Sequence, residues 1–201
     1  MTRGKWIARR LVPVVRCIAS AFYPTRYLRG RYYDESLTGW KWVLQGIFFQ
    51  KLLRINSQVP WPASPFSRVS GPATNLIFDP DDVLMFNHFG CYFQCFAARI
   101  IIGKNSYIAP NVGLITANHD MSDLDNHLLG RDIVVGEACW IGMNSVILPG
   151  VRLGPRTVVG AGSVVTKSFP DGHCIIAGAP ARVIKTLDNE GSTRGVELVH
   201  Q

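Results

Sequence analysis

A short segment of the 201-residue chain, residues 115–132, concentrates side chains that could transfer a proton. It contains two of the five histidines, His119 and His127, together with four aspartates. An imidazole is suited to acting as a general base, because its ordinary pKa lies near neutral pH. A base of this kind usually has a partner that fixes its tautomer, and the nearby candidates are Asp120, Asp123 and Asp125. The segment therefore predicts acid–base chemistry, and the spacing does not choose among the three carboxylates.

The sequence that follows must position this segment, and it repeats every six residues. Aliphatic side chains stand at six consecutive positions of the repeat: Val135, Ile141, Ile147, Leu153, Val159 and Val165. A helix repeats at about 3.6 residues and a strand at about 2, so a sustained six indicates short strands laid down at equal intervals. Four residues after each of the first five stands a small or β-branched residue: Cys139, Ser145, Val151, Thr157 and Ser163. The pattern is typical of a parallel β-helix with the aliphatic residues inside.

The same phase occurs upstream at Ile102, Ile108 and Leu114, and it is broken by the histidine segment. Leu114 and Val135 are twenty-one residues apart, which is not a multiple of six. Residues 115–134 are therefore expected to loop out between coils, on the face where such solenoids often bind their ligands. The active site is predicted in this loop, within a β-helix that spans residues 69–187 and has its first strands near Ser70.

Five segments of the repeat region resemble the hexapeptide-repeat acyltransferase superfamily. They are residues 102–112, 116–120, 140–142, 160–167 and 177–185. Their order and spacing are most similar to the galactoside and maltose acetyltransferases and to the O-acetyltransferases of capsule, exopolysaccharide and O-antigen synthesis. The resemblance implies a left-handed β-helix, a homotrimer, and acetyl-CoA bound in the groove between neighbouring prisms.

The resemblance also implies roles for individual residues. His119 takes the position of the catalytic histidine, which would accept the proton of a sugar hydroxyl as that hydroxyl attacks the thioester directly. The expected acetyl-CoA site consists of Trp140, Ala161, Gly162, Thr166, Lys167, Arg182 and Lys185. Asn87, Asp120 and Asp123 are expected on the acceptor side, although Asn87 does not align cleanly with the asparagine of the sugar acetyltransferases. No metal is expected.

Three alternatives stay open at this point. A xenobiotic or small-sugar acetyltransferase would use a similar scaffold, and an amine acceptor would be served by the same base. A zinc-dependent carbonic anhydrase-like enzyme would draw imidazoles from His88, His119 and His127. A catalytically silent trimeric scaffold would need only the fold and the N-terminal appendage.

The N-terminal part of the chain is strongly basic. Eight Lys and Arg side chains and no acidic ones precede Asp34, which accounts for the whole net charge of +7. Apolar residues recur there at helical spacing: Ile7, Leu11, Val14, Val15, Ile18 and Phe22. Pro13 disfavours a continuous helix through this stretch. Residues 1–33 are therefore expected either to bind an anionic membrane surface or to pack on the trimer. Nucleic acid is not expected, because no recognised binding motif accompanies the charge.

The chain is thus predicted to be an all-β core with a basic helical appendage (residues 1–35), a second segment (36–68) and a short tail (188–201). The second segment comprises a helix over residues 37–55 and a Pro-rich linker over residues 59–65. The apolar residues on one face of this helix are Trp40, Leu44, Ile47, Phe48 and Leu52. No apolar stretch reaches the roughly 20 residues that span a bilayer. Five cysteines without metal-ligand pairing favour a reduced, cytoplasmic protein, which could lie on the inner face of the cell membrane. Arg16 within the would-be apolar core argues against a cleaved signal peptide.

Overall fold

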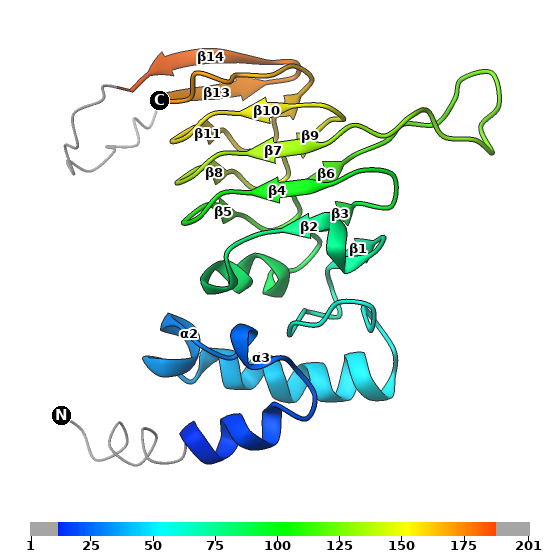
Figure 1. Ribbon diagram of the computed structural model, residues 1–201. Coiled ribbons are helices and arrows are strands. Elements are labelled where there is room, and N and C mark those ends of the chain that lie inside the picture. The colour runs from blue at the N-terminus through cyan, green and yellow to red at the C-terminus, as the bar shows by residue number, and fades with distance from the viewer. Residues whose placement is uncertain (1–11, 188–201) are drawn as a thin grey trace.

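The computed structural model describes residues 12–187, and three β-sheets in it form the faces of a prism (Figure 1). Sheet A contains β1 (Arg68–Ser70), β3 (Tyr92–Gln94), β6 (Gly113–Ile115), β9 (Val146–Ile147) and β12 (Val164–Val165). Sheet B contains β2 (Leu76–Ile77), β4 (Ile100–Ile102), β7 (Ile133–Val135) and β10 (Arg152–Leu153). Sheet C contains β5 (Tyr107–Ile108), β8 (Trp140–Ile141), β11 (Val158–Val159), β13 (Cys174–Gly178) and β14 (Ala181–Thr186).

The six-residue repeat builds the coils as predicted. Val135 pairs with Leu153 in parallel, Ile141 with Val159 and Ile147 with Val165, so each strand lies over the one eighteen positions earlier. All six aliphatic repeat positions are at most 2% exposed. The expected parallel β-helix with an aliphatic interior is therefore confirmed, and its left-handed sense stays a prediction.

The small residues of the repeat are buried at the corners of the prism. The hydroxyl of Thr157 donates to the carbonyl oxygen of Gly154 (2.8 Å), and that of Ser163 donates to Gly160 (2.6 Å). A hydroxyl buried in this way needs such a partner, because an unpaired one would cost about 1–3 kcal/mol. Cys139 and Cys174 are also buried, and burial raises the pKa of both thiols.

The two ends of the β-helix explain where the repeat fades. The first strand, β1, ends at Ser70, as expected. In the first coil the 3₁₀ segment η4 (Pro80–Asn87) lies between the strands of sheets B and A, so no six-residue pattern appears there. At the other end β13 and β14 form an antiparallel hairpin, and residues 178–181 reverse the chain direction there.

Short helices lie beneath the first coil of the prism (Figure 1). Residues 12–19 are helical and are followed by η1 (Thr25–Tyr27), α2 (Arg31–Asp34) and α3 (Thr38–Gly46), which continues as the π-helix η2 (Ile47–Leu52). A further 3₁₀ turn, η3 (Ala73–Asn75), lies between β1 and β2. The helix predicted over residues 37–55 is present, but its apolar face is divided. Trp40 is buried, whereas Leu44, Phe48 and Leu52 are exposed, because the interior contacts come from the other side of the helix, at Val43 and Gln50.

The Pro-rich segment over residues 59–65 is not an exposed linker. Its Trp61 ring lies 4.8 Å from that of Phe78, 5.0 Å from Phe86 and 5.4 Å from Tyr27, measured between centroids. Gln50 donates a hydrogen bond to the Trp61 carbonyl (3.1 Å) from the helical side. Prolines fix the backbone without requiring exposure, and here the predicted linker carries an aromatic side chain into the core. The helices and the first coil therefore share one interior.

None of the helices among residues 12–187 is long and apolar enough to cross a membrane. The predicted tail (188–201) and the first eleven residues of the basic segment lie outside the described residues.

Candidate active site

The insertion between β6 and β7 forms a two-stranded arm that projects from the side of the prism (Figure 1). Three backbone hydrogen bonds close it: Leu128 N–H to the Asn118 carbonyl (2.8 Å), Asp120 N–H to that of Asn126 (2.9 Å) and Arg131 N–H to that of Thr116 (2.9 Å). The break in the repeat thus marks an arm that carries both histidines, as predicted.

The ring of His119 is fixed by a backbone group. Its Nδ1 lies 2.7 Å from the carbonyl oxygen of Leu124. A carbonyl oxygen only accepts hydrogen bonds, so Nδ1 carries the proton and the neutral ring presents Nε2 as its basic nitrogen. The orienting partner is therefore none of the three candidate aspartates. Sequence patterns could not identify it, because every residue has a carbonyl group.

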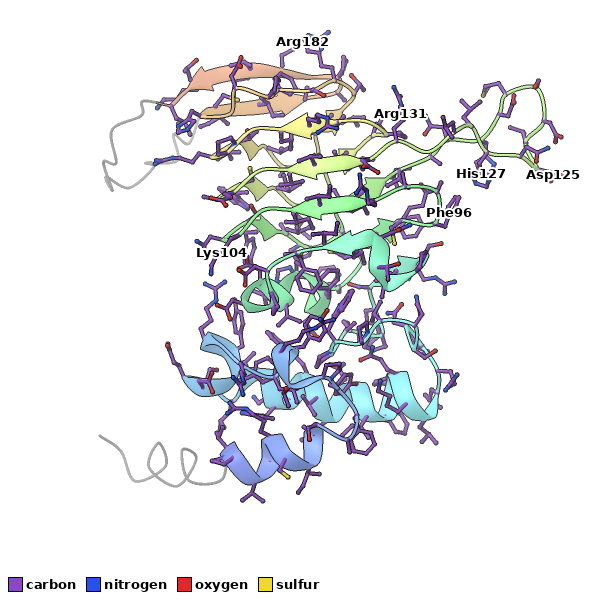
Figure 2. All side chains as sticks on the ribbon, in the orientation of Figure 1. Phe96, Lys104, Asp125, His127, Arg131 and Arg182 are labelled. Carbon is purple, nitrogen blue, oxygen red and sulfur yellow. The ribbon has the colours of Figure 1, made fainter. Side chains whose placement is uncertain are left out.

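His127 and Phe96 pack beside His119. The His127 ring centroid lies 4.2 Å from that of His119, and the Phe96 ring meets His127 edge-on at 4.9 Å. Figure 2 shows His127 on the arm and Phe96 below it, on the next coil of the prism. His127 therefore lies between His119 and the prism wall, and the aromatic contact at Phe96 had no signal in the sequence.

Both ends of the arm are attached to neighbouring coils. At one end the buried Gln94 side chain accepts a hydrogen bond from Ala117 N–H (2.9 Å), and the Thr116 hydroxyl donates to the Gln94 carbonyl (2.7 Å). At the other end Arg99 donates to the carboxylate of Asp132 (2.6 Å) and lowers the pKa of that carboxyl. The arm thus leaves the prism in a defined direction, and Gln94 is a contributor that sequence reasoning missed.

The aspartates of the arm shape its turn. Asp120 accepts hydrogen bonds from the hydroxyl and the backbone N–H of Ser122, which lower the pKa of the Asp120 carboxyl. Asp123 accepts from the Asn126 amide (2.6 Å) and from Asp125 N–H (3.1 Å). Asp125 lies near the tip of the arm in Figure 2. The roles of Asp120 and Asp123 toward an acceptor stay predictions.

Asn87 and His88 lie away from the arm, at the end of η4. The Asn87 amide donates to the carbonyl oxygens of Pro62 (3.0 Å) and Val83 (3.1 Å). His88 contacts the Ile108 carbonyl through Nδ1 (2.7 Å) and the Tyr107 hydroxyl through Nε2 (3.2 Å). Within one chain the three histidines of the zinc alternative are thus not together, and no group of three potential metal ligands occurs among residues 12–187.

Of the expected donor residues, Trp140, Arg182 and Lys185 lie on sheet C, and the other four flank β12 of sheet A. Strand register places Trp140, Val158, Ile175 and Lys185 in one row across four neighbouring strands. With about 4.8 Å between strands, this row is about 14 Å long. Trp140 and Lys185 are exposed at its two ends. The row therefore offers an apolar track with an indole at one end and an ammonium group at the other.

The remaining expected donor residues are exposed near the C-terminal end of the prism. They are Ala161, Gly162, Thr166, Lys167 and Arg182. Gly162 has a φ of +69°, which favours glycine, and a Cβ added there would meet nothing within 4 Å. Figure 2 shows Arg182 at this end of the prism and His127 out on the arm. None of the hydrogen bonds or ring contacts found in the described part of the chain joins His119 to an expected donor residue.

Residues 132–167 match the family of bacterial transferase hexapeptide proteins (six repeats). Galactoside O-acetyltransferase of Escherichia coli is 39% identical over 93 residues, which are 45% of this chain and 45% of that protein. A putative colanic acid biosynthesis acetyltransferase of Escherichia coli is 40% identical over 87 residues, 43% of this chain and 47% of that protein. The chain spans about half the length of the curated relatives it matches.

The fold has a solved counterpart in a galactoside acetyltransferase in complex with coenzyme A. The two structures superpose with a TM-score of 0.53 at 25% sequence identity, over 94% of this chain and 84% of that one. The likeness thus extends from the repeat into the helices beneath the prism, beyond the part covered by the sequence matches.

Proposed function

Because residues 132–167 are a bacterial transferase hexapeptide repeat, we propose that this chain is an acetyl-CoA-dependent O-acetyltransferase. Its acceptor is a sugar hydroxyl, of a cell-surface polysaccharide or its precursor. The observation that carries the proposal is the hydrogen bond from His119 Nδ1 to the Leu124 carbonyl, which leaves Nε2 as a base on an exposed arm. The galactoside and colanic acid acetyltransferases among the relatives support a sugar as the acceptor.

The chemistry needs only one proton-transfer group. Nε2 of His119 accepts the hydroxyl proton while the acceptor oxygen bonds to the acetyl carbonyl carbon of the thioester. The carbon–sulfur bond then breaks, and the imidazolium returns its proton to the departing CoA thiolate. The acetyl group moves directly to the sugar, so no acyl-enzyme forms. His127, packed against His119, limits rotation of the ring during the two proton transfers.

Sheet C supplies the donor site in this proposal. The pantetheine arm of acetyl-CoA lies along the row from Trp140 toward Lys185, with its thioester at the indole end. Lys185, together with Arg182 and Lys167, binds the phosphates, because charge-assisted hydrogen bonds to phosphate are strong. The solved galactoside acetyltransferase, which contains coenzyme A, supports a CoA site on this fold.

A second copy of the chain completes the site, as expected of a homotrimer. Within one chain the arm leaves between sheets A and B, while the donor row lies on sheet C. Large apolar side chains on the arm are exposed in the single chain, at 89% for Met121 and 91% for Leu129. Exposed groups of this kind are typical of an interface. A neighbouring prism that covers them would place its sheet C against His119.

The proposal is tested by following release of free CoA thiol from acetyl-CoA, with and without an acceptor panel. The panel contains a cell-surface polysaccharide preparation, small galactosides and maltose, and simple amines. Acceptor-dependent thiol release with sugars supports the proposal. Thiol release only with amines would show that the reaction is N-acetylation. No release with any acceptor, and no acetyl-CoA binding by calorimetry, would contradict it.

Lys185→Ala is expected to raise the KM for acetyl-CoA roughly five- to tenfold with little change in kcat, since one cation–phosphate contact is removed. The measurement is the initial rate across acetyl-CoA concentrations at low and moderate salt. Lys104→Ala is the matched control, because Lys104 is exposed but ion-paired to Asp79 and is not part of the row. An equal rise in KM for both variants would show that Lys185 has no specific contact.

Gln94→Ala is expected to lower kcat about tenfold while the KM for acetyl-CoA stays within about twofold, because the arm loses its anchor but the donor row does not change. Gln94→Glu keeps an acceptor oxygen for Ala117 N–H and is expected to recover most of the activity. If both variants lose activity equally, the hydrogen bond to Ala117 is not what positions the base.

A further inference from the structure

The helix beneath the prism exposes an apolar stripe that faces away from its packing contacts. Leu37, Leu44, Phe48 and Leu52 are 55%, 70%, 49% and 67% exposed, and they form the outer stripe. Their spacing of seven, four and four residues places them on one helical face, with Lys41 between the first two. The buried residues of the same helix, including Val43 and Gln50, lie on the opposite face.

The neighbouring helix repeats this arrangement. Val14, Ile18 and Phe22 recur every four residues and are 58%, 63% and 40% exposed, and they form the second stripe. Away from this stripe Ala19 is buried, and so is Tyr23 just after the helix, where its hydroxyl donates to the Gln50 side chain (2.9 Å). Two helical segments in contact with each other thus each expose a stripe of apolar side chains. Exposed apolar surface on this scale marks a site of interaction with a protein or a membrane.

The charge around the stripes identifies the partner. Residues 12–55 contain seven cations (Arg16, Arg26, Arg29, Arg31, Lys41, Lys51 and Arg54) and two anions (Asp34 and Glu35), a net charge of 7 − 2 = +5. A second copy would bring two surfaces of this charge together and repel. An anionic lipid bilayer complements both features, because its headgroups attract cations and its interface accepts apolar side chains.

We propose that the outer stripe and the second stripe dock the protein on an anionic membrane surface, with both helices lying in the interfacial plane. Lys41 lies within the outer stripe and Arg54 follows it, so each can reach a headgroup while the leucines and Phe48 enter the acyl boundary. The helices lie at the end of the prism opposite β14 (Figure 1), so docking leaves the arm and the donor row free.

The test is sedimentation of the full-length protein with vesicles of phosphatidylcholine alone and of phosphatidylcholine with phosphatidylglycerol in equal amounts. The Leu44→Ser/Phe48→Ser/Leu52→Ser variant is expected to lower the partition coefficient on the anionic vesicles at least about tenfold. Val183→Ser/Ile184→Ser on β14 is the matched control, since these side chains are 51% and 65% exposed at the other end of the prism, and it is expected to bind like the parent. Lys41→Gln/Arg54→Gln is expected to weaken binding roughly fivefold per cation.

Three results would overturn the proposal: no binding to anionic vesicles, an equal loss in the β14 control, or a smaller mass of the triple variant in solution by light scattering. The last would show that the outer stripe is an interface between copies. Circular dichroism and the thermal midpoint establish that each variant is folded. His119→Ala should bind vesicles like the parent, so a failure of docking is distinguishable from a failure of the proposed catalytic function.

Discussion

His119→Ala is expected to lower the rate of acetyl transfer to a sugar by about two to four orders of magnitude, which is the usual effect of removing a general base. The loss should appear in kcat, because the acceptor hydroxyl is no longer deprotonated as it attacks. Acetyl-CoA affinity, measured by calorimetry, should remain unchanged, because none of the expected donor residues lies on the arm. The assay is thiol release at saturating acetyl-CoA with the best acceptor of the panel.

His127→Phe is the control for this prediction, since it retains a flat ring against His119 but has no nitrogen to accept a proton. Its activity is expected to stay within about threefold of the parent. If the activity of the His127→Phe variant fell as far as that of the His119→Ala variant, the two histidines would share the proton transfer. If the His119→Ala variant kept near-normal activity, the base would lie elsewhere.

Trp61→Ala is expected to lower the free energy of unfolding by about 3–5 kcal/mol, the cost of emptying a large aromatic site in a core. The indole is 1% exposed and contacts rings from the helices, from the first coil and from η4. It therefore connects two parts of the chain that sequence reasoning placed on either side of a linker. Urea unfolding followed by circular dichroism measures the change.

The control is Phe66→Ala, five residues further along the same segment, where the ring is 69% exposed. Its unfolding free energy should change by less than about 0.5 kcal/mol. A loss of similar size in both variants would mean that the segment is stabilised by its backbone and not by the buried indole. Two separate unfolding transitions in the parent would contradict a shared interior.

The prism could be predicted from the sequence because one local rule acts at every coil. An aliphatic residue such as Ile141 or Ile147 enters the interior at each sixth position, and the broken phase after Leu114 locates the arm. The histidines and aspartates of the arm could be located on the same grounds, and their role in the chemistry stays a prediction.

The parts that could not be predicted depend on contacts between distant segments. Helical spacing groups Leu44, Phe48 and Leu52 on one face, but only the packing partners decide whether that face is buried, and here they lie on the other side. The partner of His119 is a backbone carbonyl, and the hydrogen bond that fixes the arm comes from Gln94 on an earlier coil. Neither contact has a signature in residue type or spacing.

The stacking of strands in sheet C fixes the distance between Trp140 and Lys185. Trp140 and Lys185 are separated by three strand steps, of which the first two are the height of one coil each and the third crosses the β13–β14 hairpin. Removing a block of eighteen residues between β8 and β13 would shorten that distance to two steps, about 10 Å, while preserving every inward-facing position. Adding a block of eighteen would lengthen it to four. The number of coils therefore sets the length of a ligand that can contact both ends of the row. A protein of this architecture can change that length while its interior residues stay the same.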